Sequence, residues 1–146
     1  MKKNYPAKTV FLDTNVLLNV LLVREGEESA RQILEMGAKR QLRICFSSLT
    51  VANEAYIARK AYPKSELMEV FQLYLKKYVI LPNNDMGIMF AMNSDCPDFE
   101  DALQIACAEA ELCDAIITCN TSHFAPYTDI PVYTPEDFLK KICRKV

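Results

Sequence analysis

The sequence is poor in the residues from which several common kinds of site are built. It has only three glycines, which excludes a glycine-rich phosphate-binding loop, a collagen-like repeat and a flexible linker. It has one histidine, His123, and its six cysteines form no C-x-x-C pair, so we expect no zinc site. A catalytic pair of His123 with a cysteine has no local support. We interpret the cysteines as free, buried thiols in a reducing compartment.

An uninterrupted hydrophobic run is also absent. The most apolar segment, residues 10–23, carries Asp13, Asn15 and Asn19, which a signal peptide or a transmembrane helix would not carry centrally. We therefore expect a cytoplasmic protein. A chain of 146 residues, 51% hydrophobic and 25% charged, has the size and composition of one globular domain, and we predict a single domain over residues 1–146.

Lysine and arginine are missing from residues 78–139, which carry 11 acidic residues. The net charge of −2 hides this asymmetry, because residues 1–77 carry 13 basic and 8 acidic residues and the last seven residues carry four basic ones. The net charge alone does not indicate a nucleic-acid-binding protein. Two interpretations of the acidic segment are open: a solvated acidic surface, or a set of carboxylates that holds a cation.

Short apolar strands alternate with amphipathic helices along the chain. The patterns predict strands at residues 9–12, 42–46, 78–81, 115–118 and 131–133. They predict helices at residues 15–23, 27–40, 48–59, 65–77, 85–92, 98–112 and 136–143. This alternation favours an α/β domain with a mainly parallel sheet.

Acidic and amide side chains follow the predicted strands. Asp13 ends the first strand, Glu54 lies early in the helix after the second, and Asn120 follows the fourth. Asp98 and Asp101 begin the helix that leads into the fourth strand. Because ligands of open α/β sheets bind at the carboxyl ends of the strands, we expect these side chains to converge. Carboxylates so placed repel one another unless a cation such as Mg²⁺ or Mn²⁺ lies between them.

Each of these residues also has a purely structural alternative. Asp13 can cap the helix that follows it, and Asp98 with Asp101 can form a capping box. Glu54 can be an exposed helical residue, and Asn120 suits a left-handed turn. The argument for a site therefore depends on the positions of these residues relative to the predicted strands.

Three segments carry a resemblance to a known family. They are FLDTNVLLN at residues 11–19, NEAY around Glu54, and DFEDALQIACAEAELCDAIITCNTSHF at residues 98–124. Together they resemble the PIN-domain ribonucleases, which include the VapC-type toxins of bacterial toxin–antitoxin pairs. The resemblance extends from about residue 9 to residue 138. It implies a three-layer α/β/α fold around a central, mainly parallel five-stranded sheet, and an acidic site that uses Mg²⁺ or Mn²⁺ to hydrolyse RNA.

The resemblance assigns roles to individual residues. It implies that Asp13, Glu54 and Asp101 are metal ligands, with Asp98 as an additional acid found in the subfamily that has a D-x-x-D-A motif. The fourth position of the family is often Asp, and here it is Asn120, within T-C-N. An amide is a weaker ligand than a carboxylate, so one bound metal and two are both open. The subfamily that this sequence resembles often has Asn at that place.

Neutral and basic residues complete the candidate site. The candidates to hold Asp13 or a phosphate by hydrogen bonds are Thr14, Asn15 and Thr118, followed by Ser47 and Ser48. The candidates to bind RNA phosphates, with a solubilising surface as the alternative, form three clusters: Lys39, Arg40 and Arg43, then Arg59, Lys60 and Lys64, and finally Lys140, Lys141, Arg144 and Lys145.

The expected function is that of a metal-dependent endoribonuclease, and the resemblance implies a role as the toxin of a toxin–antitoxin pair. An antitoxin protein and a second copy of the chain are the expected partners beside RNA. Apolar stripes at residues 50–59 and 65–77 can serve either of these partners, and a role in the core explains the stripes equally well.

Two rival functions follow from the same residues. The first is a catalytically weak or inactive PIN-like module that binds RNA or protein, which Asn120 favours. The second is a phosphoryl-transfer domain with Asp13 as the nucleophile. It fits poorly, because Asn15 stands where the haloacid-dehalogenase signature needs a second Asp, and no lysine lies between residues 77 and 140 to serve a receiver domain.

Overall fold

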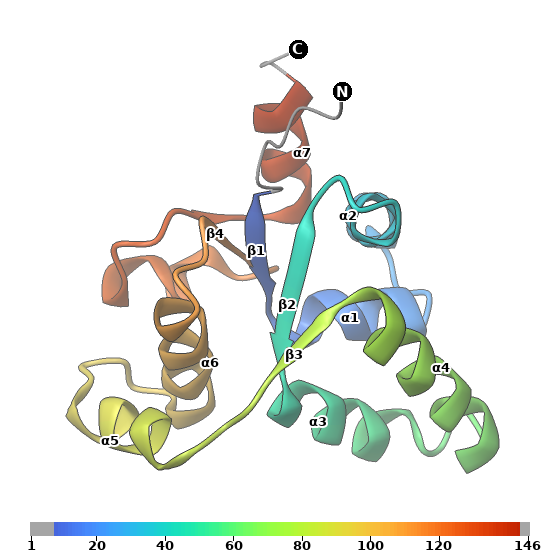
Figure 1. Cartoon of the computed structure of the whole chain (residues 1–146), viewed down its shortest axis with the longest axis horizontal. Helices are drawn as coiled ribbons and strands as arrows, with labels where there is room; N and C mark the ends of the chain where they lie inside the picture. The colour runs from blue at the N-terminus through green and yellow to red at the C-terminus, as the bar shows by residue number, and fades with distance from the viewer. Residues whose placement is uncertain (1–7, 144–146) are drawn as a thin grey trace.

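The protein is built on a parallel sheet, seen in a computed structural model that describes residues 8–143, with the backbone alone for Cys143 (Figure 1). The candidate phosphate-binding residues Arg144 and Lys145 lie outside the described residues. The strand order is β3-β2-β1-β4-β5, and every pairing is parallel. The strands are β1 (Thr9–Leu12), β2 (Arg43–Ser47), β3 (Val79–Leu81), β4 (Ala115–Ile117) and β5 (Val132–Tyr133). The expectation of a mainly parallel, five-stranded sheet is confirmed.

Seven α-helices are present in the described part of the chain, close to the predicted positions. They are α1 (Thr14–Leu21), α2 (Glu27–Ala38), α3 (Ser48–Ala58), α4 (Lys64–Lys77), α5 (Asp85–Asn93), α6 (Phe99–Ala110) and α7 (Pro135–Cys143). Two short 3₁₀ turns after β4, η1 (Thr121–His123) and η2 (Ala125–Tyr127), were not predicted. The helices and the sheet together form three layers.

Three helices end about two residues earlier than their sequence patterns predicted. Soon after α1, α2 and α6 the chain passes through left-handed backbone conformations at Val23, Arg40 and Leu112, whose φ angles are 50°, 60° and 56°. A left-handed residue commonly terminates a helix, and glycine usually occupies this place. This glycine-poor sequence has other residues at these places, so no glycine marks the ends of the three helices in the sequence.

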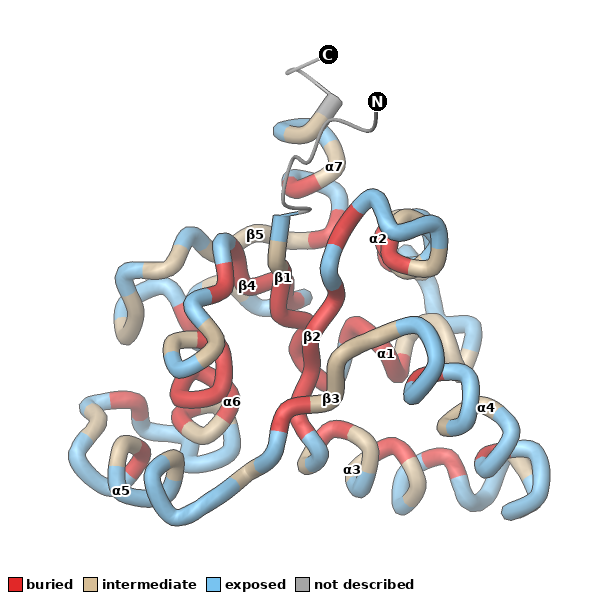
Figure 2. Tube along the Cα trace, in the orientation of Figure 1, coloured by how far each residue is buried: buried red, intermediate tan, exposed pale blue. Residues whose placement is uncertain are grey.

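The alternation of side chains along the strands divides the core into two parts. In β1, Val10 and Leu12 face the side covered by α1, α2, α4 and α7, while Phe11 faces the side covered by α5 and α6. In β4, Ile117 and Ile116 divide in the same way. Figure 2 shows that the central strands are buried along most of their length. The α/β/α arrangement is thus fixed by a residue-by-residue alternation.

The carboxyl ends of all five strands lie at one edge of the sheet because every pairing is parallel. From β1 the chain builds outward through β2 and β3, and it then returns to the other side of β1 to form β4 and β5. The order therefore reverses between β1 and β4. In open α/β sheets the crevice at such a reversal is the usual place for a ligand.

Two expectations from composition can be compared directly with the described residues. No helix among residues 8–143 is long and apolar enough to cross a membrane. Five cysteines have described side chains, and all five are free. Four of them are buried, as expected, but the expectation is wrong for Cys119, which is exposed. Cys119 lies just beyond β4, in the loop that leaves the sheet edge.

Gly37 allows α2 to pack closely on β2. A Cβ atom at Gly37 would overlap Cγ1 of the buried Ile44 and lie 3.1 Å from Cε1 of Tyr78. We therefore expect Gly37→Ala to lower the free energy of unfolding by about 1–3 kcal/mol, although alanine is the better helix former. Urea unfolding measures this change.

Gly87→Ala is the matched control for this substitution. Gly87 also lies in a helix, α5, but the nearest atom to its Cβ would be 3.8 Å away. Helix propensity alone should then act, and stability should stay the same or rise by up to about 1 kcal/mol. Equal effects of the two substitutions would contradict the close packing of α2 on β2.

Candidate active site

Asp13 lies at the reversal of strand order and is held from several sides. Its backbone N–H donates to the carbonyl oxygen of Ile117 on β4, at 3.0 Å. Gln104 Nε2 on α6 donates to Oδ1 of the Asp13 carboxylate at 2.9 Å, and Thr118 Oγ1 donates to Oδ2 at 3.0 Å. Only 6% of Asp13 is exposed. The carboxylate is therefore fixed by donors from both α6 and the end of β4.

Burial raises the pKa of Asp13 above its ordinary value, because it removes water from the charged form. The hydrogen bonds from Gln104 and Thr118 act in the opposite direction, since they stabilise the carboxylate. The charge of His123 also lowers the pKa. Asp13 is thus an acid whose burial is only partly compensated by the residues around it.

Asp98 and Asp101 lie at the start of α6. Asp98 is the N-cap, and its Oδ1 accepts a hydrogen bond of 3.0 Å from the backbone N–H of Asp101. The pKa of Asp101 is raised to about 6. Burial is the largest cause, and the negative charges of Asp98 and Asp13 raise the pKa further. The structure therefore brings Asp13, Asp98 and Asp101 close enough for their charges to interact.

Asn120 lies beyond the end of β4, and its amide is already engaged. Its Oδ1 accepts a hydrogen bond of 3.0 Å from Ser122 Oγ, and its Nδ2 lies 3.0 Å from Nε2 of His123. The other ring nitrogen of His123 lies 3.7 Å from Oδ2 of Asp101. His123 therefore connects Asn120 to the acidic side chains of α6.

Glu54 occupies a different position from the other acids. It is 0% exposed, and its Oε2 accepts a hydrogen bond of 2.8 Å from the Tyr74 hydroxyl on α4. Its Oε1 has no hydrogen-bond partner. Burial raises the pKa of Glu54 to about 7, and the Tyr74 hydroxyl opposes this rise. In the described part of the chain no hydrogen bond joins Glu54 to Asp13 or Asp101, and its side-chain partner is Tyr74.

A pair of threonines connects α3 to the segment after β1. Thr14 Oγ1 lies 2.8 Å from Thr50 Oγ1, and both residues are buried. Thr50 is one helical turn before Glu54, and its backbone N–H donates to Ser47 Oγ, which caps α3. Thr14 thus contacts α3 rather than the Asp13 carboxylate, which it affects only through its backbone N–H.

The remaining neutral candidates lie near the same edge of the sheet. Asn15 is exposed in the first turn of α1, directly after the Asp13–Thr14 pair. Ser48 Oγ donates to Oδ1 of Asn83 at 3.0 Å, which ties the start of α3 to the segment after β3. Ser48 therefore has a structural contact of its own.

The three basic candidates after α3 lie away from these acids. Arg59 is the C-cap of α3, Lys60 follows it, and Lys64 begins α4. The guanidinium of Arg59 stacks on the Tyr56 ring, 3.8 Å from its centroid. Because α3 begins at the sheet edge and has 11 residues, its far end is about 16 Å from that edge. These bases are not brought to the carboxylates.

The donor set fits a hard divalent cation held by few protein ligands. Within residues 8–143, no group of three or more His, Cys, Asp or Glu side chains is arranged to hold a metal ion. Mg²⁺, however, is commonly held by one or two carboxylates, with waters and phosphate oxygens as the other ligands. Asp13 and Asp101 supply such carboxylates, and no Lys or Arg in residues 78–139 is present to balance them. The residues therefore suit a cation such as Mg²⁺ or Mn²⁺.

Three contacts at or near this site were missed by sequence reasoning. Gln104 binds Asp13, His123 lies beside Asp101, and Tyr74 binds Glu54. A signal existed for Gln104: it is a polar residue three positions after Asp101, on the buried face of an otherwise apolar helix. No comparable signal marks Tyr74, whose position in α4 is typical of a core aromatic residue.

A family model described as PIN domain matches residues 9–122 of the chain. The match includes β1 to β4 and every acidic residue of the candidate site. No curated protein matches the chain significantly.

Several solved structures have the same fold at low sequence identity. VapBC2 of Rickettsia felis, bound to a DNA fragment from its promoter, has a TM-score of 0.66 and 19% identity, over 85% of this chain and 96% of that one. A toxin–antitoxin complex of Klebsiella pneumoniae has a TM-score of 0.63 and 23% identity, over 86% and 97% of the two chains. VapC20 of Mycobacterium tuberculosis, a toxin that cleaves the sarcin–ricin loop, has a TM-score of 0.63 and 11% identity, over 84% and 98%.

The contact between Gln104 and Asp13 can be tested by a double-mutant cycle. We expect Gln104→Leu to lower the free energy of unfolding by about 1–2 kcal/mol, because Asp13 loses a buried donor. In the background of Asp13→Ala most of this cost should disappear, giving a coupling energy of about 1 kcal/mol in urea unfolding. A coupling energy near zero would contradict a direct contact.

Glu54 should make stability depend on pH. Its folded-state pKa of about 7 lies above the ordinary value of 4.5, so the stability it contributes is complete below about pH 4.5 and is lost as the pH rises through 7. When the pH is raised from about 5 to about 8, the wild type should therefore lose about 2 kcal/mol of unfolding free energy that the Glu54→Gln variant does not lose. Urea unfolding in metal-free buffer at both pH values measures this difference.

Glu69→Gln is the control for this pH dependence. Glu69 is an exposed acid on α4, the helix that also carries Tyr74. Its substitution should leave the difference in stability between the two pH values unchanged. The same change from both substitutions would show that general surface charge, rather than the burial of Glu54, causes the effect.

Proposed function

The chain belongs to the PIN domain family, and on this basis we propose that it is a divalent-metal-dependent endoribonuclease. The observation that carries the proposal is the meeting of Asp13 and Asp101 at the crevice between β1 and β4. The negative charge of Asp13 raises the pKa of Asp101, and the charge that opposes this rise comes from His123, since residues 78–139 contain no lysine or arginine. A site that gathers uncompensated negative charge is suited to bind a cation.

The proposed ligands are Asp13 and Asp101, with Asp98 as a further acid that holds or orients water. Glu54 is buried and bound by Tyr74 through Oε2, so it is proposed to act on the cation only through a water at its other oxygen, Oε1. The divalent cation, when bound, supplies a water of lowered pKa as the nucleophile and offsets the negative charge of the phosphate. Gln104 and Thr118 keep the Asp13 carboxylate in one orientation, so that it need not reorganise when a substrate arrives.

His123 and Asn120 occupy the opening of the same crevice. The His123 ring lies between the Asn120 amide and the Asp101 carboxylate, where it can exchange a proton with a group bound there. Asn120 orients this ring through its Nδ2. In this proposal Asn120 acts through His123, and the weak metal affinity of an amide does not prevent activity.

The proposed substrate is RNA and the proposed setting is the cytoplasm. A solved relative supports this substrate, since the toxin VapC20 of Mycobacterium tuberculosis cleaves the sarcin–ricin loop. Arg59, Lys60 and Lys64 lie at the far end of α3, so they would contact RNA several nucleotides from the cleaved bond. Residues 123–146 are proposed to complete the same single domain, through β5 and α7.

An antitoxin protein and a second copy of the chain are the proposed protein partners. The relatives from Rickettsia felis and Klebsiella pneumoniae were solved as toxin–antitoxin complexes, which supports an antitoxin here. Large apolar side chains are exposed on α3 and α4, the two helices in which the sequence shows apolar stripes. They are Tyr56, Ile57, Met68, Leu73 and Leu75. They support self-association through α3 and α4.

A catalytically weak module that binds RNA or protein is the second candidate function. The observation in its favour is that the Asn120 amide is engaged by Ser122 and His123, so its oxygen, which already accepts one hydrogen bond, is a poorer metal ligand than a carboxylate. Such a module would bind RNA in the presence of Mg²⁺ without cleaving it.

Cleavage of RNA by the purified protein tests the proposal. We expect cleavage of a structured RNA with Mg²⁺ or Mn²⁺, and its loss on addition of a chelator. Asp101→Asn should lower the rate at least about 100-fold, because loss of one ligand removes about 3 kcal/mol of transition-state stabilisation. Without metal the same variant should be at least as stable as the wild type, since it relieves the repulsion from Asp13 and Asp98.

Asp137→Asn is the matched control for this assay. Asp137 is an exposed acid in the first turn of α7, and its substitution should leave the rate unchanged. Wild-type protein that binds RNA but does not cleave it with either metal would establish the module instead. Equal activity of Asp101→Asn and the wild type would show that Asp101 is not a metal ligand.

A further inference from the structure

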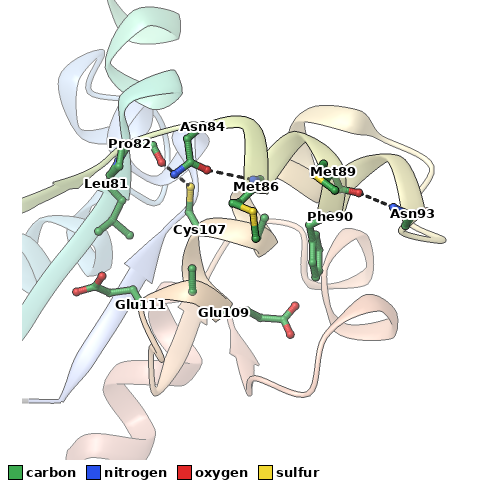
Figure 3. A pocket seen from close by; sticks show the side chains of 13 residues that line it. Leu81, Pro82, Asn84, Met86, Met89, Phe90, Asn93, Cys107, Glu109 and Glu111 are labelled. Atoms are coloured by element: carbon green, nitrogen blue, oxygen red, sulfur yellow. Dashed lines mark hydrogen bonds between the residues drawn. The ribbon is translucent and has the colours of Figure 1, made fainter.

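An apolar groove runs along α5 and the second half of α6, away from the Asp13 carboxylate (Figure 3). We call it the α5–α6 groove. Its volume is about 780 Å³. Its side chains come from Leu81 at the end of β3 and Pro82 directly after it, from Met86, Met89 and Phe90 on α5, and from Cys107 on α6. Figure 3 shows Glu109 and Glu111 on the side of the groove opposite α5.

The helix α5 exposes much more apolar surface than it buries. Its sequence, DMGIMFAMN, is mostly apolar, yet Ala91 is its only fully buried residue. The exposed fractions of Met86, Met89 and Met92 are 69%, 58% and 73%. A contiguous exposed apolar surface of this kind marks a place where another molecule binds, and methionine adapts well to such contacts.

The charged residues around the groove are all acidic. A second hollow shares Phe90, Asn93 and Glu109 with the groove and adds Asp95 and Asp129 to its rim. Glu111 is paired with Arg43, at 2.6 Å. Glu109, Asp95 and Asp129 form no ion pair with any other residue in the described part of the chain. Glu109, which lines both hollows, and Asp95 and Asp129, which line the adjoining second hollow, are therefore uncompensated carboxylates beside the exposed apolar side chains of α5.

This combination of charge and apolar surface selects one kind of occupant. A second copy packed symmetrically on the groove would place the same acidic rim against itself, which is unfavourable. RNA and anionic lipid surfaces carry the same sign of charge as the rim and are repelled. Of the edge strand β3, only its last residue, Leu81, lines the groove, and Pro82, which has no backbone N–H, follows it directly. An added β-strand would therefore find almost no backbone to pair with. An amphipathic helix with basic flanks meets both the apolar floor and the acidic rim.

We propose that the α5–α6 groove is a docking site for a basic amphipathic helix supplied by another polypeptide. Its apolar residues, spaced three and four apart, pack against Met86, Met89 and Phe90. Its lysine or arginine side chains meet Glu109, Asp95 and Asp129. This docking does not depend on the proposed nuclease activity, since the groove shares no residue with the site around Asp13.

A peptide of about four helical turns provides the probe, with leucine on one face and lysine on both flanks. Fluorescence anisotropy of the labelled peptide with the full-length protein should give a Kd of about 10–100 μM. The affinity should fall as salt is added, because the rim charges are screened. Two matched peptides, one with glutamate in place of lysine and one with alanine in place of leucine, should bind at least about tenfold more weakly.

Substitutions in the protein locate the binding to the groove. Glu109→Gln with Asp129→Asn should weaken binding of the lysine peptide about three- to tenfold, and Met86→Ala with Met89→Ala should do the same. The matched controls are Asp137→Asn on α7 and Val23→Ala after α1, an exposed acid and an exposed apolar residue elsewhere. They should leave the Kd unchanged. All four altered proteins should keep the wild-type circular dichroism spectrum.

Three results would overturn the proposal. The first is no binding of the lysine peptide up to about 1 mM. The second is equal binding of the glutamate peptide, which would show that the acidic rim plays no part. The third is a loss of self-association on Met86→Ala with Met89→Ala, seen by sedimentation, which would assign the face to a second copy of the chain. Nuclease activity enters none of these measurements, so its failure would be seen separately.

Discussion

The burial of one carboxylate at the end of the central strand organises the carboxyl edge of this protein. Asp13 is taken out of water, which is unfavourable for a charged group, and the donors that offset this cost come from Gln104 on α6 and Thr118 beyond β4. Its backbone N–H is bound to Ile117 as well. The pairing of β1 with β4 and the position of α6 are therefore coupled at a single side chain. A change in either element would leave the buried charge with fewer donors.

The parallel sheet explains why the acids meet there, and this part was accessible from the sequence. A strand pattern at residues 9–12 followed directly by Asp13, and an N-cap at Asp98 before an amphipathic helix, are local signals that the structure reproduces. Once the sheet is parallel, the strand ends converge without further information. The side-chain contact between Gln104 and Asp13 is different, because it joins residues 91 positions apart and depends on how α6 is rotated. No local pattern determines that rotation.

The surroundings of Glu54 also depend on the rotation of a helix, which the local sequence does not determine. Its sequence position after the second strand fits an acid at the sheet edge, but the face of α3 on which it lies turns it toward Tyr74 and the core. Thr50, one turn earlier on the same face, contacts Thr14 instead. One helical turn thus separates Thr50, which contacts the segment after β1, from Glu54, which contacts α4. Helix ends were also hard to predict, because the left-handed positions are occupied by residues such as Leu112 rather than by glycine.

The acidic segment of residues 78–139 has two separate physical consequences. Near the sheet edge, Asp98 and Asp101 add to the charge of Asp13, and a small, hard cation would relieve this repulsion. Around α5, Glu109 and its neighbours border an apolar surface. A basic side chain on an amphipathic helix would suit that place better than a metal ion, because the helix would also cover the exposed methionines. The two places repel a phosphate backbone alike as long as they are uncompensated. The same kind of negative charge thus suits two different partners in the two places, a small hard cation beside Asp13 and a basic helix in the α5–α6 groove.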